Sequence, residues 1–173
     1  MKIILWILIG LVGLALLVYA IGLLLPKERV VRLSSVFNVL PETLYAIVIN
    51  NDDWQYRTDL QNLIVIERSG EMEVWDEVSK SGDTIRFKTR EKTPHSFYSF
   101  DMETRVFTGY WTAAFEPTED GGTLFTATEY ISVKNPFVKM LSYLFFDVKK
   151  FMESYQHNLK TKATTIQSKS DQA

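Results

Sequence analysis

The side chains best suited to acid–base chemistry are two carboxylates and one histidine. Glu77 lies two residues after Trp75 in a predicted strand, and Glu129 lies in another predicted strand. A carboxylate acts as a general acid or base when burial shifts its pKa. His95 falls in a predicted loop, where it is either a base at the mouth of a cavity or a solvated side chain. Glu77, Glu129 and His95 are therefore the candidate catalytic residues.

The orientation of the Glu77 side chain decides whether its carboxylate can act in catalysis. Alternation along the strand 72–78 places Trp75 and Glu77 on the same face. If Trp75 points into a cavity, Glu77 is an inward carboxylate. In the alternative interpretation Glu77 faces outward or pairs with an arginine such as Arg86 or Arg90.

Other reaction types lack the residues they need. The chain has no cysteine and only two histidines, far apart in sequence, so no thiol chemistry and no metal site are expected. No G-x-S-x-G, phosphate-loop or G-x-G-x-x-G motif is present, so no catalytic triad and no cofactor are expected. With 19 Lys and Arg against 21 Asp and Glu, the chain lacks the basic surface of a nucleic-acid-binding protein. The residues therefore favour binding over catalysis without deciding between them.

The N-terminal segment is long enough to cross a membrane. Ile3–Leu25 carries no charge, and as a helix it would span about 34 Å against a hydrocarbon core of about 30 Å. A cleaved signal peptide with Gly22 near its cleavage site is the alternative, but such apolar regions are shorter. We therefore predict one transmembrane helix within residues 1–27. Basic residues flank both ends, and their balance slightly favours a cytoplasmic position for the following domain.

The rest of the chain reads as strands framed by two helical regions. Strands are predicted at 30–36, 63–66, 72–78, 84–89, 96–101, 109–116 and 123–133, with a short helix from Pro41 after the first. Turn residues at 69–70, 81–83 and 120–122 separate several of them. Strands in this meander order form an antiparallel sheet.

The last region repeats apolar residues at steps of three and four. This pattern starts at Pro136 and predicts one amphipathic helix over 136–160, followed by a polar, frayed tail over 161–173. The fold class is therefore α+β, with a curved antiparallel sheet of about seven strands around a long C-terminal helix. The soluble domain is predicted to cover residues 28–160.

Several short stretches in this order resemble the START-like (SRPBCC) superfamily, including its polyketide cyclase/dehydratase-type members. They are the segments 40–45 (LPETLY), 51–54 (NDDW), 75–77 (WDE), 122–130 and 135–136. Bacterial members with an N-terminal membrane helix match the chain best. The resemblance implies a helix-grip fold with a deep cavity between sheet and C-terminal helix, which holds an apolar or amphipathic ligand. Relatives include cyclases and aromatases, ligand carriers and proteins that bind protein partners, so the fold does not choose the function.

An unusual number of aromatic side chains supports a lined cavity. One interpretation is a ligand pocket, and the other is a solid aromatic core. On the first, the candidate ligand-binding residues are Trp54, Trp75, Phe87, Phe100, Trp111, Ala113, Phe115, Tyr130 and Phe145.

Three functions remain open at this point. The expected function is membrane-anchored binding of a hydrophobic or amphipathic small molecule, such as a lipid or a polyketide. One alternative is a cyclase/dehydratase-like enzyme that uses a cavity carboxylate. The other is a membrane-tethered module for an unidentified protein partner, which would have a filled core and an exposed apolar patch.

Overall fold

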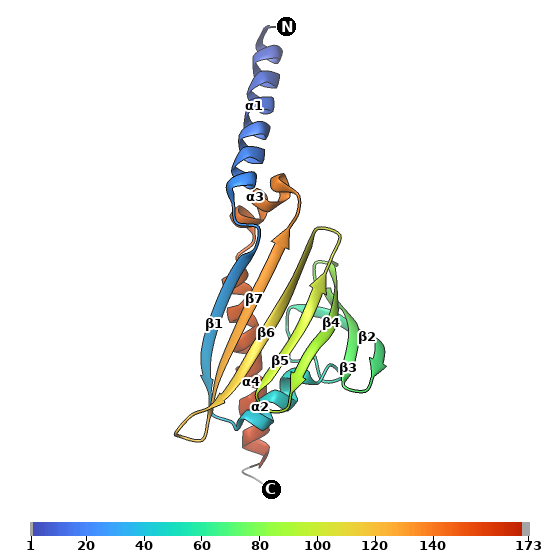
Figure 1. Ribbon diagram of the computed structural model, residues 1–173, viewed down its shortest axis with the longest axis vertical. Coiled ribbons are helices and arrows are strands. Elements are labelled where there is room, and N and C mark those ends of the chain that lie inside the picture. The colour runs from blue at the N-terminus through green and yellow to red at the C-terminus, as the bar shows by residue number, and fades with distance from the viewer. Residues whose placement is uncertain (1, 171–173) are drawn as a thin grey trace.

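A computed structural model describes residues 2–170 (Figure 1). Helix α1 precedes a seven-stranded sheet with one short helix inserted, and two helices follow the sheet. The helices are α1 (Lys2–Leu24), α2 (Pro41–Ile49), α3 (Pro136–Phe145) and α4 (Val148–Ser170). The strands are β1 (Arg29–Phe37), β2 (Leu60–Ser69), β3 (Met72–Ser79), β4 (Thr84–Thr93), β5 (Phe97–Glu103), β6 (Phe107–Pro117) and β7 (Thr123–Val133).

Strands β2 to β7 form a meander, and β1 extends the sheet by pairing with β7. The strand order is β1-β7-β6-β5-β4-β3-β2, and every neighbouring pair is antiparallel. The predicted turns are confirmed, because Gly70, Gly82 and Gly121 each adopt a positive φ between strands. The α+β class and the curved antiparallel sheet are therefore as predicted. Figure 1 shows α4 running along one face of this sheet.

Helix α1 extends away from the sheet and is covered by very little protein. Within it, an 18-residue window has a mean hydropathy of 2.8 and none of that window is buried. The helix is long and apolar enough to cross a membrane, by length and composition.

The C-terminal region forms two helices where one was predicted. Phe146 adopts an extended conformation, and the Asp147 side chain accepts a hydrogen bond from the backbone N–H of Lys150 at 3.1 Å. Asp147 is thus the N-cap of α4, a role that aspartate fills well. The apolar repeat continues through the break and so conceals it in the sequence.

Helix α4 is also longer than predicted. It continues to Ser170, where a frayed tail was expected from residue 161; residues 171–173 lie outside the described part of the chain. Leu159 and Ala163 are buried, and Ile166 packs on the core. These positions continue the helical spacing, so burial of one face holds the helix together despite its polar composition.

Helix α2 closes the end of the sheet opposite α1 (Figure 1). Leu44 and Tyr45 are buried there, and the Tyr45 ring packs edge-on against Phe115 at 5.4 Å between centroids. Phe115 in turn contacts Phe125 at 5.2 Å. This aromatic cluster makes the closed end of the domain solid.

Candidate ligand cavity

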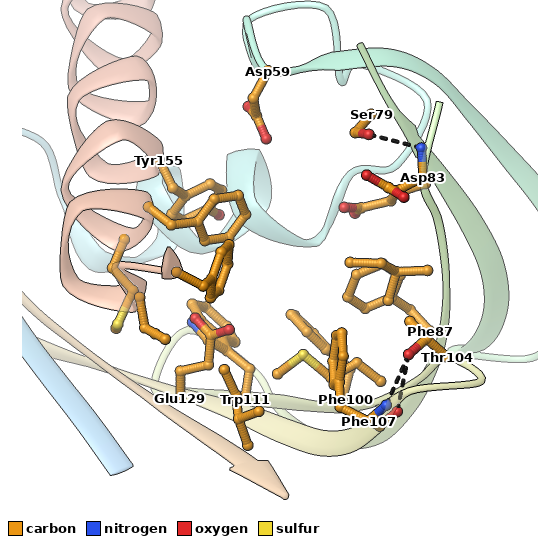
Figure 2. A pocket seen from close by; sticks show the side chains of 18 of the residues that line it. Asp59, Ser79, Asp83, Phe87, Phe100, Thr104, Phe107, Trp111, Glu129 and Tyr155 are labelled. Atoms are coloured by element: carbon orange, nitrogen blue, oxygen red, sulfur yellow. Dashed lines mark hydrogen bonds between the residues drawn. The ribbon is translucent and has the colours of Figure 1, made fainter. Parts of the chain in front are cut away.

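A cavity of about 830 Å³ lies between the concave face of the sheet and helix α4. A volume of this size falls within the range of small-molecule sites. Figure 2 shows Phe87, Phe100 and Trp111 along its sheet side, with Tyr155 projecting from α4. The space between the sheet and α4 is therefore a cavity and not a filled aromatic core.

The aromatic wall follows from strand register. Trp75 on β3 lies opposite Phe87 on β4, and their rings stack at 5.3 Å between centroids. Phe100 on β5 lies opposite Trp111 on β6, and these rings stack at 4.9 Å. Opposite residues on antiparallel strands share a face, so the predicted alternation brings all four rings to the cavity.

The open end of the cavity faces α1. Exposed residues line it there: Lys27 follows α1, Asp83 lies in the β3–β4 turn, Val106 lies in the β5–β6 turn, and Phe146 joins α3 to α4. Figure 1 shows both turns at the end of the sheet from which α1 extends. We call this ring of residues the mouth. A ligand that passes through it enters from the side of α1.

Glu77 points inward, but it is held by an arginine. Both carboxylate oxygens accept hydrogen bonds from Arg57, at 2.5 and 2.6 Å, and Trp75 Nε1 donates to Glu77 at 3.0 Å. The Glu77 side chain is buried, and the Arg57 guanidinium also lies over the Tyr155 ring. Arg86, suggested as the partner, instead binds Asp76 on the outer face. Glu77 thus forms a structural ion pair with Arg57 in the cavity wall.

Glu129 is a buried carboxyl group in the cavity wall. It is 7% exposed, lies opposite Trp111 in the β6–β7 register, and points toward the cavity in Figure 2. Among residues 2–170 no side chain forms a hydrogen bond or an ion pair with its carboxyl oxygens. Burial raises the pKa of Glu129 from 4.5 to about 7, although Arg29 acts to lower it. Near neutral pH this group is therefore a poised donor or acceptor.

The raised pKa of Glu129 predicts a specific pH dependence of stability. Between pH 4.5 and about 7 the folded chain holds a proton that the unfolded chain has released, so stability falls as pH rises through this window. The total contribution is about 3 kcal/mol. Glu129→Gln should remove this slope and be more stable than the parent at pH 8 in urea unfolding. Identical pH profiles for the two proteins would contradict a buried, proton-binding Glu129.

The structure separates the predicted site residues into three groups. Trp54, Trp75, Phe87, Phe100, Trp111, Glu77 and Glu129 line the cavity. Ala113 and Phe115 face inward but lie in the solid core near α2. Trp111, Ala113 and Phe115 share one face of β6, as strand alternation predicts. Alternation does not predict how far along the strand each residue lies from the closed end, and that distance decides whether it lines the cavity.

Three other predicted residues lie away from the cavity. Tyr130 follows Glu129 on β7, so it faces the outer side, where it stacks on Tyr110 at 4.1 Å. Phe145 ends α3 and is 82% exposed. His95 occupies an exposed turn with φ 63°, 3.9 Å from Glu42, and its pairing is with surface groups. These three positions do not support a direct role at the cavity.

Several polar residues of the cavity were not predicted from the sequence, and they come from the 50–59 loop, from the start of β1, and from α3 and α4. They are Tyr56, Arg57, Tyr155 and, at the mouth, Arg29 and Lys139. The sequence gives little indication of these residues, because Tyr56 and Arg57 follow the 51–54 segment in a stretch without helical or strand periodicity. Within residues 2–170 no group of three or more histidines or carboxylates could hold a metal ion.

Comparisons with known proteins bear on the fold. No family model matches the chain, and no curated protein matches it. A protein from Thermus thermophilus is 20% identical with a TM-score of 0.65, over 80% of this chain and 99% of its own. A START superfamily protein from Mycobacterium smegmatis is 15% identical with a TM-score of 0.61, over 79% and 98%. The Zhui aromatase/cyclase from a Streptomyces species is 8% identical with a TM-score of 0.65, over 79% and 94%.

Each of these matches covers about four fifths of this chain. At such identities the likeness concerns the backbone architecture. The chain therefore has the helix-grip fold of the START-like (SRPBCC) superfamily.

Proposed function

We propose that this protein binds a hydrophobic or amphipathic small molecule in the cavity while α1 anchors it in a membrane. The observation that carries this proposal is the aromatic cavity of about 830 Å³ whose mouth lies at the α1 end. Burial of apolar ligand surface contributes about 25 cal/mol per Å², so even a short alkyl chain gains useful affinity. The solved relatives include a START superfamily protein and an aromatase/cyclase, which supports a cavity that takes such molecules.

The polar groups of the cavity favour a ligand that is amphipathic. Glu129 offers one carboxyl group near the sheet, and Asp59, Ser79 and Asp83 lie on the opposite side (Figure 2). A ligand with an apolar body and one hydroxyl or carbonyl group would satisfy Glu129 without displacing the Arg57–Glu77 pair. Sites of this kind use a few polar groups to orient an otherwise apolar ligand.

Tryptophan fluorescence provides the test. Three of the four tryptophans, Trp54, Trp75 and Trp111, line the cavity, and the fourth, Trp6, lies in α1. In a Trp6→Phe background, titration with a brominated fatty acid should quench most of the emission and should saturate. A tryptophan emission that stays constant, or that declines without saturation, would count against binding in this cavity.

Acid–base catalysis is the second candidate, and Glu129 is the observation that favours it. A carboxyl group with a pKa of about 7 inside an apolar cavity suits proton transfer at neutral pH. If the chain is a dehydratase, molecules recovered from the Glu129→Gln variant should be heavier by one water than those from the parent. Identical masses from the two proteins would leave binding as the function.

A further inference from the structure

Helix α3 and its junction with α4 expose an unusual amount of apolar surface. Five large apolar side chains are 38–82% exposed there, with Phe145 at the upper limit. We call them the apolar patch: Phe137, Leu144, Phe145, Phe146 and Phe151. Contiguous exposed apolar groups of this kind mark interaction sites on soluble domains.

The apolar patch is fixed next to the end of α1. A Cβ atom on Gly22 would lie 1.9 Å from the carbonyl oxygen of Pro136, so only glycine allows this contact between α1 and α3. The buried Lys139 of α3 also donates from Nζ to the carbonyl oxygen of Leu25 at 3.5 Å. Helix α3 is therefore packed on α1, and the two helices cannot separate freely.

A second contact fixes the far end of α3. The guanidinium of Arg29 donates to the carbonyl oxygen of Phe146 at 2.8 Å and lies over the Tyr143 ring. A cation at the C-terminal end of a helix also complements the helix dipole. Because Arg29 begins β1, the orientation of α3 is tied to the sheet as well as to α1.

The apolar patch is continuous with the mouth of the cavity. Phe146 and Phe151 are exposed and also line the cavity, and their rings lie 6.2 Å apart. Across the mouth, Val106 is 55% exposed and lines the cavity too. Exposed charges of both signs lie at the same end, with Lys27, Arg105 and Lys134 accompanied by Glu28, Asp83 and Asp147, so the apolar side chains and not a net charge distinguish this end.

From this arrangement we infer that α3 lies in the interface of the bilayer that holds α1, with Leu144 and Phe145 among the acyl chains. The mouth then opens into that leaflet, and the ligand enters sideways from the membrane without crossing water. This inference rests on the proposed function in one respect, the membrane anchor α1. The bilayer is the partner that fits, because the patch continues the apolar surface of a helix long enough to span it.

Site-directed spin labelling of the full chain tests this inference. The chain has no cysteine, so each introduced cysteine carries the only label. The labelled variants are Phe145→Cys in the patch, Leu17→Cys in α1 and Val36→Cys on β1, in vesicles of phosphatidylcholine and phosphatidylglycerol. Val36 is the matched control, because it is 51% exposed and lies at the end of β1 away from α1. The measurement is collision of each label with oxygen and with a water-soluble nickel chelate.

The expected result places the Phe145→Cys label about 5–10 Å into the headgroup and acyl boundary. Leu17→Cys should lie deep in the hydrocarbon and Val36→Cys in water. A Phe145→Cys label in water beside a buried Leu17→Cys label overturns the inference and leaves the anchor standing. A Leu17→Cys label in water contradicts the anchor itself. A Phe145→Cys label shielded from both reagents indicates a protein covering the patch and also overturns the inference.

Discussion

Replacing Ala127 by leucine is expected to weaken binding of a long apolar ligand at least about tenfold. Ala127 on β7 is 1% exposed and lines the cavity. The added carbons would occupy space that the ligand needs. Each ligand methylene left unburied costs about 0.8 kcal/mol, so two of them account for a tenfold loss.

The matched control for this change is Ala114→Leu. Ala114 lies on the neighbouring strand β6, half-buried on the outer face, and outside the cavity lining. It should bind the brominated fatty acid as the parent does. Unchanged affinity in an Ala127→Leu protein with native circular dichroism would contradict a ligand site between the sheet and α4.

Arg57→Met is expected to cause the largest loss of stability among single changes in the cavity wall. Removing Arg57 leaves the buried Glu77 without its partner, which costs about 3–5 kcal/mol. For a domain of this size that cost corresponds to a fall in Tm of about 6–20 °C. Thermal unfolding of the full chain in detergent, followed by circular dichroism, measures it.

Two further variants separate this effect from loss of any arginine. Arg86→Met removes the ion pair between Arg86 and Asp76, the residue before Glu77. This pair has a similar geometry but lies on the outer face of the sheet, so its loss should change Tm little. The double variant Arg57→Met with Glu77→Leu should recover most of the lost stability, because no unpaired charge remains. If Arg57→Met is as mild as Arg86→Met, Glu77 is not buried as described.

Local patterns were sufficient to predict the sheet. Alternation through β3 placed Trp75 and Glu77 on one face without deciding whether that face is the inner one, and the glycines at 70, 82 and 121 marked the turns. The break at Asp147 was not predicted, since the apolar repeat continues across it. Asp147, the N-cap of α4, was the one local signal of this break. A single aspartate within a periodic stretch is weak evidence that a helix starts.

The cavity was predictable only in part. Glu129 was proposed only as a titratable residue in a predicted strand, and its neighbour Tyr130 was proposed for the same cavity, although only Glu129 faces inward. Arg57 was missed because it reaches Glu77 from a loop, and no periodic pattern connects the two. Depth was not predictable at all: Trp111 and Phe115 share a face, yet only Trp111 lines the cavity.

Native mass spectrometry of the full chain, purified in detergent, tests the central claim most directly. We predict a bound apolar or amphipathic molecule that is retained by Ala114→Leu and lost from Ala127→Leu. This prediction would be contradicted by a protein that carries no such molecule and takes up none from added lipids and fatty acids. A molecule bound equally by both variants would contradict it as well, since its site would then lie outside the cavity.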